Sequence, residues 1–287
     1  MNSALPDQPH WWQWPTILSF DAPVVAILWQ WLLAQAAAVQ LRPVHVFVLG
    51  TSVWLAYAAD RWIEGWRLRP EQTRTQRHRF YQRHRWVVAV VWCVILVADV
   101  GVAIAQLTRR EFTGGLLLLA PVLAYLLSHQ LIHRTRQWRP PKEVCVAALL
   151  AGGVALFPAV QPDATLRFLA APLGLFALLC FANCALISVW EHEVDATHGQ
   201  TSLARQFAGG AAVSQTLPWM LMVVGWLAAL AESGPARSAA LCAVASSGAL
   251  GAIDLLEPKL GWQRSRVLAD VALMTPAIPL LVYLGTR

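Results

Sequence analysis

The stretches Asp60-Arg61-Trp62-Ile63-Glu64 and Glu191-His192-Glu193-Val194-Asp195 each place two carboxylates four residues apart where a long apolar run ends. Residues four apart lie on one face of a helix. Each stretch can therefore aim two carboxylates at one point, and the two stretches together offer four. Such a concentration of negative charge favours the binding of divalent cations, so we expect the functional site here.

The composition places the chain among membrane proteins. It is 57% hydrophobic and 13% charged, whereas an ordinary soluble domain has about 25% charged residues. A membrane-spanning helix needs about 20 mostly apolar residues, and short polar joints separate nine such runs. We predict an all-α polytopic membrane protein with nine transmembrane helices in a single domain over residues 1–287. The predicted spans are 17–39, 43–62, 86–107, 114–132, 144–160, 166–189, 209–231, 238–256 and 267–285.

The N-terminal residues 1–16 are predicted to be a short interfacial segment. The first fifteen residues contain no Lys or Arg, unlike the charged start of a cleaved signal peptide. Trp11, Trp12 and Trp14 are typical of the aromatic belt at a membrane surface.

The basic residues predict the orientation. The joints that follow spans two, four, six and eight share one side and carry 16 of the 22 Lys and Arg residues. The positive-inside rule assigns that side to the cytoplasm. Both acidic stretches fall there, so we expect a protein of the cytoplasmic (inner) membrane whose site faces the cytoplasm. The net charge of +6 is then a topological signal, and no nucleic-acid partner is expected. The basic residues of the other side are Arg42, Arg109, Arg110, Arg167, Arg237 and Arg287.

Both acidic stretches resemble the motifs of a known family. The UbiA superfamily of intramembrane prenyltransferases carries Asn-Asp-x-x-Asp-x-x-x-Asp after its second helix and Asp-x-x-x-Asp-x-x-x-Gly, followed by a Ser/Thr turn, after its sixth. The counterparts here are AYAADRWIE from Ala56 to Glu64 and EHEVDATHGQTS from Glu191 to Ser202. Pro140-Pro141-Lys142 leads into the fifth predicted helix, where the family often has a basic residue. The resemblance extends along the whole chain and implies a nine-helix UbiA-like bundle.

The chain also departs from these motifs. Ala56 stands where the family has Asn, Tyr57 stands where it has the first Asp, and Glu64 and Glu191 replace Asp. Glutamate is still a hard oxygen ligand suited to Mg²⁺, but its extra methylene shifts the carboxylate. The departures mark a divergent member whose metal affinity or substrate choice differs.

The resemblance implies a magnesium-dependent transfer of an isoprenoid group. Mg²⁺ held by the two motifs grips a prenyl diphosphate, the carbon–oxygen bond ionises, and the allylic cation alkylates a lipophilic, often aromatic, acceptor. Magnesium is normally bound through one or two carboxylates plus phosphate oxygens and acts as a Lewis acid. The expected metal ligands are Asp60, Glu64, Glu191 and Asp195.

Other residues receive roles in the same reaction. Asp60 and Asp195 are the expected indispensable ligands, and the rings of Tyr57 and Tyr125 are candidates for stabilising the cation. Basic side chains pair with the diphosphate. The expected substrate-binding residues are Arg61, Arg139, Lys142, Thr201 and Ser202. The prenyl chain and the membrane lipids would occupy the apolar part of the bundle.

Acidic residues elsewhere in the predicted spans allow two interpretations. Asp21, Asp254 and Asp270 lie at the depth of the acidic stretches, and they either form a second shell around the site or pair with Arg264 or Arg266. Asp99 lies deeper and is expected to hydrogen-bond a neighbouring helix.

Three alternatives to a prenyltransferase stay open at the level of sequence. An intramembrane terpene cyclase would use the same diphosphate site without an acceptor. A non-catalytic relative that binds isoprenoid lipids would account for the departures at Ala56 and Tyr57. An unrelated transporter is disfavoured, because the polar residues gather at one face instead of the midplane, where transporter sites lie.

The charge asymmetry generates a topology prediction. The joints at 66–85 and 133–143 should be cytoplasmic, and Arg287 should lie on the opposite side. Single cysteines placed at residues 75 and 287 should react with a membrane-impermeant thiol reagent from opposite sides of intact cells. Labelling of both from one side would contradict the nine-span arrangement.

Overall fold

The computed structural model describes residues 8–67, 75–128, 141–194, 202–207 and 209–286 of the 287-residue chain. These residues form helices and contain no strand. The elements are η1 (Trp11–Gln13), α1 (Trp14–Ile17), α2 (Asp21–Ala36), α3 (Pro43–Arg67), α4 (Gln76–Arg83), α5 (Arg85–Gln106), α6 (Arg109–Leu127), α7 (Lys142–Val160), α8 (Leu166–Trp190), α10 (Leu203–Gln206), α11 (Gly210–Ala231), α12 (Gly234–Leu260), α13 (Trp262–Ala272) and α14 (Ala277–Gly285).

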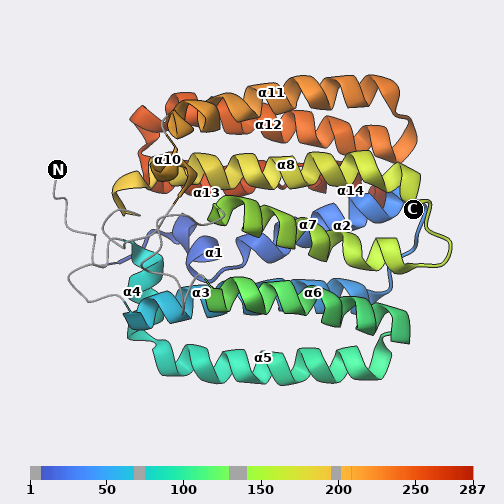
Figure 1. The fold of residues 1–287 in the computed structure, drawn as a ribbon, viewed down its shortest axis with the longest axis horizontal. Coiled ribbons are helices and arrows are strands. Elements are labelled where there is room, and N and C mark those ends of the chain that lie inside the picture. Colours follow the sequence, from blue (N-terminus) through green and yellow to red (C-terminus); the bar gives the residue numbers. More distant parts are fainter. Residues whose placement is uncertain (1–7, 68–74, 129–140, 195–201, 208, 287) are drawn as a thin grey trace.

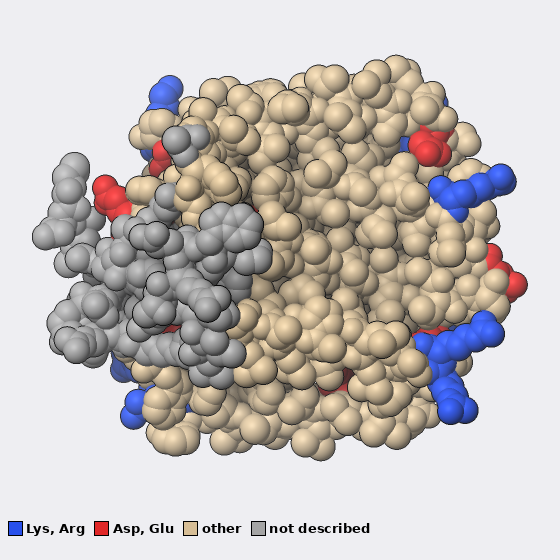
Figure 2. All heavy atoms as spheres, viewed as in Figure 1, with Lys and Arg blue, Asp and Glu red and all other residues tan. Residues whose placement is uncertain are grey.

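The long helices lie side by side in one bundle, and the short elements α1, α4 and α10 gather at one end of it (Figure 1). We call this the motif end, because α3 and α8 finish there with Glu64 and Glu191 close to their last turns. Figure 2 shows charged side chains gathered at the two ends of the face drawn, with a broad band of other side chains between them. This separation is what a bilayer requires of a bundle that crosses it.

The helices are long and apolar enough for an integral membrane protein. Among the described residues, α5, α6, α7, α8, α11 and α12 each pass a length and hydropathy test for a span. Two bent pairs raise the number to eight: residues 11–17 with α2, bent by 72°, and α13 with α14, bent by 42°. The all-α membrane bundle is confirmed, whereas the number nine is not. The predicted span that is not among these eight is 43–62, which corresponds to α3. Polar side chains such as Thr51, Ser52 and His45 lower its mean hydropathy, and they contact neighbouring helices.

The surface of the bundle is apolar at its periphery. Val97 of α5, Leu117 of α6 and Leu230 of α11 are 73%, 72% and 75% exposed. Monomeric soluble proteins rarely leave such large contiguous apolar areas in water. Lipid contact therefore explains why these helices carry branched aliphatic side chains on their outer faces.

Asp99 fixes the peripheral helix α5 to α3. Its carboxylate accepts hydrogen bonds from the hydroxyls of Thr51 and Ser52, the latter at 3.0 Å. A polar group without a partner inside the membrane raises the free energy of the fold. The contact therefore fixes the face of α5 that is turned toward α3. The predicted hydrogen bond from Asp99 to a neighbouring helix is confirmed.

Glu111 joins three helices at the end opposite the motif end. Its buried carboxylate accepts from Arg42 at 2.6 Å and from Gln161 at 2.7 Å, and it pairs with the His45 ring at 2.9 Å. It also accepts from the backbone N–H of Thr108 at 2.7 Å, which completes a capping box at the start of α6. The carboxylate thereby ties α3, α6 and the end of α7 together.

The break between α13 and α14 depends on a tryptophan. In a continuous helix the N–H of Ala277 would bond the carbonyl of Leu273, but here it bonds Met274 instead, at 3.0 Å. Pro276 has no N–H to donate. The break deprives the Leu273 carbonyl of its helical donor, and this carbonyl instead accepts a hydrogen bond from the indole N–H of Trp29 at 2.9 Å. The fully buried Trp29 ring also stacks on Phe176 with centroids 4.8 Å apart.

This contact predicts a specific loss of stability. Trp29→Phe keeps a ring against Phe176 but leaves the Leu273 carbonyl without its donor, at a cost of about 1–3 kcal/mol. The matched control is Trp31→Phe on the same helix, a partly exposed ring beside Tyr283. Thermal unfolding in detergent should show a lower midpoint for Trp29→Phe alone. Equal midpoints for the two variants would show that the indole does not stabilise the break.

Candidate functional site

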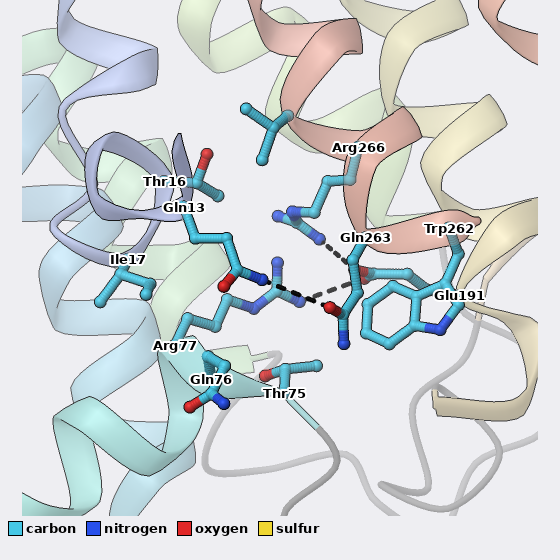
Figure 3. Close-up of a pocket in the computed structure, with 11 residues that line it drawn as sticks. Gln13, Thr16, Ile17, Thr75, Gln76, Arg77, Glu191, Trp262, Gln263 and Arg266 are labelled. Atoms are coloured by element: carbon cyan, nitrogen blue, oxygen red, sulfur yellow. Dashed lines mark hydrogen bonds and ion pairs between the residues drawn. The ribbon is translucent and has the colours of Figure 1, made fainter. Parts of the chain in front are cut away.

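Glu191 lies between two arginines at the motif end. Its Oε1 accepts from Arg266 Nη1 at 2.6 Å, and its Oε2 accepts from Arg77 Nη2 at 3.1 Å. All three side chains are largely buried, with 5% of Glu191 and 15% of each arginine side chain exposed. Figure 3 shows the two guanidinium groups converging on the carboxylate. This cluster connects the end of α8 with α4 and α13.

A pocket opens around this cluster. Besides the three charged residues it is lined by Gln13, Thr16, Ile17, Thr75, Gln76, Trp262, Gln263 and Val267. Gln13 and Gln263 face each other across it, with the Gln13 side-chain amide donating to the Gln263 oxygen at 3.3 Å (Figure 3). Among the described residues of the lining, Glu191 is the only acidic one. The charged groups of the described lining are therefore two cations and the one anion that they share.

Helix α4 carries Arg77 into the pocket because its first turn is anchored. Thr75 caps α4 by accepting from the backbone N–H of His78. The ring of His78, which is 1% exposed, pairs through Nε2 with Glu64 at 2.8 Å. Glu64 of the first motif thus docks α4 against the end of α3.

The arginines determine the ionisation of Glu191. Burial alone would raise the pKa of this carboxyl, but the adjacent Arg266 and Arg77 together hold its pKa well below its ordinary value. Burial and the nearby Arg266 in turn lower the pKa of Arg77, with Glu191 acting in the opposite direction. Glu191 is therefore ionised at neutral pH, and its single negative charge is shared by two arginines.

Arg61, which was expected to bind substrate, supports the sharp turn between α1 and α2. Its guanidinium donates to the carbonyl of Thr16 and to the hydroxyl of Ser19. Ser19 has a positive φ of 62° and also shares a hydrogen bond of 2.9 Å with the Tyr81 hydroxyl. The Arg61 side chain is buried directly behind Thr16 of the pocket lining, so it contributes positive charge to that region.

Two expected site residues, Lys142 and Ser202, lie next to residues that hydrogen-bond each other where α7 begins. Lys142 is close enough to Glu64 and Glu191 to help lower the pKa of Glu191. Next to it, Glu143 accepts from the backbone N–H of Leu203 at 3.2 Å, at the start of α10. Ser202, just before α10, is fully buried, and its hydroxyl has no hydrogen-bond partner among the described residues.

The predicted tyrosines lie close to the first motif. Tyr125 of α6 is within electrostatic range of Asp60, Glu64 and Tyr57. The guanidinium of Arg61 lies 5.9 Å from the centre of the Tyr57 ring. Their predicted role, the stabilisation of an allylic cation, stays a prediction.

A second polar cluster lies under the pocket. Asp270, four residues after Arg266 on α13, accepts from the Asn183 side chain at 3.3 Å and hydrogen-bonds Asp21. Asp254 accepts from the indole of Trp190 at 2.9 Å. The carboxylates expected as a second shell are therefore near the site, and each has a partner.

Several expected residues lie outside the described part of the chain. They are Arg139, Asp195 and Thr201. Conversely, sequence reasoning did not select Arg77, Arg266 or the glutamines of the pocket. Arg77 was hidden among the arginines of a basic joint, and Arg266 was considered only as a partner for nearby aspartates. The i, i+4 spacing of Arg266 and Asp270 was the available signal.

The expected magnesium ligands do not form a metal site within the described residues. Glu64 is engaged by His78, and Glu191 by two arginines. Three or more ligand side chains do not come together anywhere in the described ranges. A cation beside Glu191 would also face two guanidinium groups. The described members of the set therefore do not fit Mg²⁺ in this arrangement.

Comparison with known proteins places the fold. No family model matches the chain, and no curated protein matches it. Among solved structures, the apo structure of a UbiA homolog from Aeropyrum pernix K1 is similar with a TM-score of 0.56 and 14% sequence identity, over 92% of this chain and 98% of that one. The chain has a UbiA-like fold.

The Glu191 cluster predicts a stability change. Glu191→Gln leaves two buried arginines without their shared anion, at a cost on the order of 3 kcal/mol. The matched control is Glu193→Gln, an exposed position two residues along. Thermal unfolding in detergent at neutral pH should show a lower midpoint for Glu191→Gln only.

A comparison of wild type with Glu191→Gln at several pH values tests the lowered pKa of Glu191. Because its pKa is lowered in the folded state, the carboxylate stabilises the fold above the unfolded value of about 4.3 and loses this effect as the pH falls. The difference in midpoint between wild type and Glu191→Gln should therefore shrink below about pH 4. A difference that is independent of pH would contradict the ion-pair account.

Proposed function

We propose that the protein is an intramembrane prenyltransferase of the UbiA type. It transfers an isoprenoid group from a prenyl diphosphate to a lipophilic, aromatic acceptor. The observation that carries this proposal is a UbiA-like fold over 92% of the chain with two largely buried arginines at one end of its apolar bundle. A prenyl diphosphate matches this arrangement, because its anionic head would lie at the charged end and its apolar tail among the apolar helices.

The residues of the site match the needs of the reaction. Cleavage of the carbon–oxygen bond requires that the charge on the departing diphosphate be stabilised, and fixed cations in a partly desolvated site do this well. Arg77, Arg266 and Lys142 supply such cations at the motif end. The prenyl chain would extend from there between the apolar helices. Tyr57 and Tyr125 would offer their ring faces to the allylic cation.

Substrate contacts by Arg61, Arg139, Thr201 and Ser202 are part of the same proposal. Ser202 is supported by its buried hydroxyl without a described partner. Arg61 is supported only through its charge, since its hydrogen bonds hold the turn at Ser19.

Magnesium dependence stays a prediction. Asp60 and Asp195 are the ligands expected to be indispensable, and Asp195 lies outside the described residues. When bound, the ion would act as a Lewis acid toward the diphosphate. We also propose, from the charge asymmetry, that the motif end faces the cytoplasm of the inner membrane.

A non-catalytic lipid-binding relative is the second candidate. It is supported by Tyr57 in place of a carboxylate and by the neutralisation of Glu191 through two arginines. Such a protein would bind a prenyl diphosphate and leave it intact, whereas a terpene cyclase would release diphosphate without an acceptor.

The three functions are separated by one product assay. The purified protein in detergent is incubated with prenyl diphosphates of several chain lengths and with aromatic acceptors, with and without magnesium, and the products are analysed by mass spectrometry. We expect a prenylated acceptor, and an Arg266→Gln variant should lower its yield by at least about tenfold through weaker leaving-group stabilisation. The control is Arg264→Gln, an exposed arginine on the same helix. Cyclised hydrocarbon or unchanged substrate would refute the transferase.

A further inference from the structure

We propose that Arg77 and Arg266 bind the diphosphate directly, without a bridging metal ion, and that Glu191 is a resident anion that the ligand displaces. This inference rests on the proposed function, because it takes a prenyl diphosphate as the ligand. It assigns to Glu191 a role opposite to that of a metal ligand.

The geometry of the cluster carries the first step. Each oxygen of Glu191 faces a different guanidinium, at 2.6 Å and 3.1 Å. The carboxylate therefore occupies the position between two cations where a phosphate group with its oxygens would fit. Arginine recognises carboxylate and phosphate with the same planar set of donors, so one anion can replace the other.

The unfilled donors carry the second step. The Nε atoms of both Arg77 and Arg266 are buried and have no hydrogen-bond partner among the described residues. A guanidinium has five N–H donors, and one carboxylate shared by two such groups leaves several unused. A diphosphate offers more acceptor oxygens and more charge than a carboxylate. Its binding would satisfy donors that the resident anion does not.

The rest of the pocket points to the same ligand chemistry. Its lining adds the side-chain amides of Gln13 and Gln263 and the hydroxyl of Thr16. Amide and hydroxyl groups can donate to phosphate oxygens, whereas Mg²⁺ is held by one or two carboxylates together with phosphate oxygens. Glu191, the one carboxylate among the described residues of the lining, already pairs with the two arginines. The charges of the described lining thus suit an anion better than a metal ion.

Binding measurements on Glu191→Gln decide between the two roles. Farnesyl diphosphate is titrated into the purified protein in detergent by calorimetry, once in EDTA and once in magnesium, with inorganic diphosphate as a competitor. If Glu191 is a resident anion, wild type binds in EDTA and Glu191→Gln binds about tenfold tighter there, since the competing carboxylate is gone. Glu193→Gln should bind like wild type.

The other results have distinct meanings. Binding only in magnesium, weakened by Glu191→Gln, would overturn this inference and leave the proposed function standing. The absence of farnesyl diphosphate binding under both conditions would refute the proposed function and the inference with it. Equal competition by phosphatidic acid in the same detergent would overturn the assignment to a prenyl diphosphate.

A second variant covers the case in which Glu191→Gln does not fold. Arg266→Lys keeps the positive charge and the pairing with Glu191 but loses the planar set of donors. It should weaken binding in EDTA by about tenfold, whereas the matched variant Arg264→Lys should not. Unchanged affinity in Arg266→Lys would overturn direct guanidinium binding.

Discussion

The ion cluster of Glu191 with Arg77 and Arg266 is the interaction on which the motif end depends. It joins the end of α8 to the short helix α4 and to the first half of α13. Apolar packing also holds these elements, since α8 and α13 contribute to the main core and Tyr81 of α4 packs against Ala58 and Val88. The ion cluster joins their polar ends around the pocket.

The remaining polar contacts follow from the same constraint, which is that a charge removed from water needs a partner. Glu64 meets this need through His78, Asp99 through two hydroxyls of α3, and Glu111 through Arg42 and His45. The contacts of Asp99 and Glu111 join elements that are distant in sequence, whereas Glu64 and His78 join the consecutive helices α3 and α4. Each contact fixes how the helices that it joins lie against one another.

Much of the architecture could be predicted from the sequence, because a run of about 20 apolar residues has few alternatives to a membrane-crossing helix. The positions of α5 to α8 follow from this, and so does the gathering of both motifs at one end. The break at Pro276 and the turn at Ser19 were missed, since each lies inside an apolar run. At these two places the backbone carbonyls of Leu273 and Thr16 accept hydrogen bonds from Trp29 and Arg61. Both donors are far away in the sequence.

The candidate site was predicted less completely than the fold. The residue types and their spacing selected Glu64 and Glu191, which lie near the ends of α3 and α8, but they did not predict what these carboxylates bind. The partner of each carboxylate depends on packing between helices, however, and the sequence contains many arginines from which to choose. Arg77 and Arg266 became visible only when α4 and α13 were placed against the end of α8.

The most direct test of this account is an experimental structure of the protein with a non-hydrolysable prenyl thiodiphosphate, determined in EDTA and again in magnesium. The account predicts that in both structures the phosphate oxygens contact the guanidinium groups of Arg77 and Arg266, and that Glu191 has moved away from the position between them. A diphosphate bound only in magnesium, with Glu191 coordinating the ion and the two arginines not touching the ligand, would contradict it.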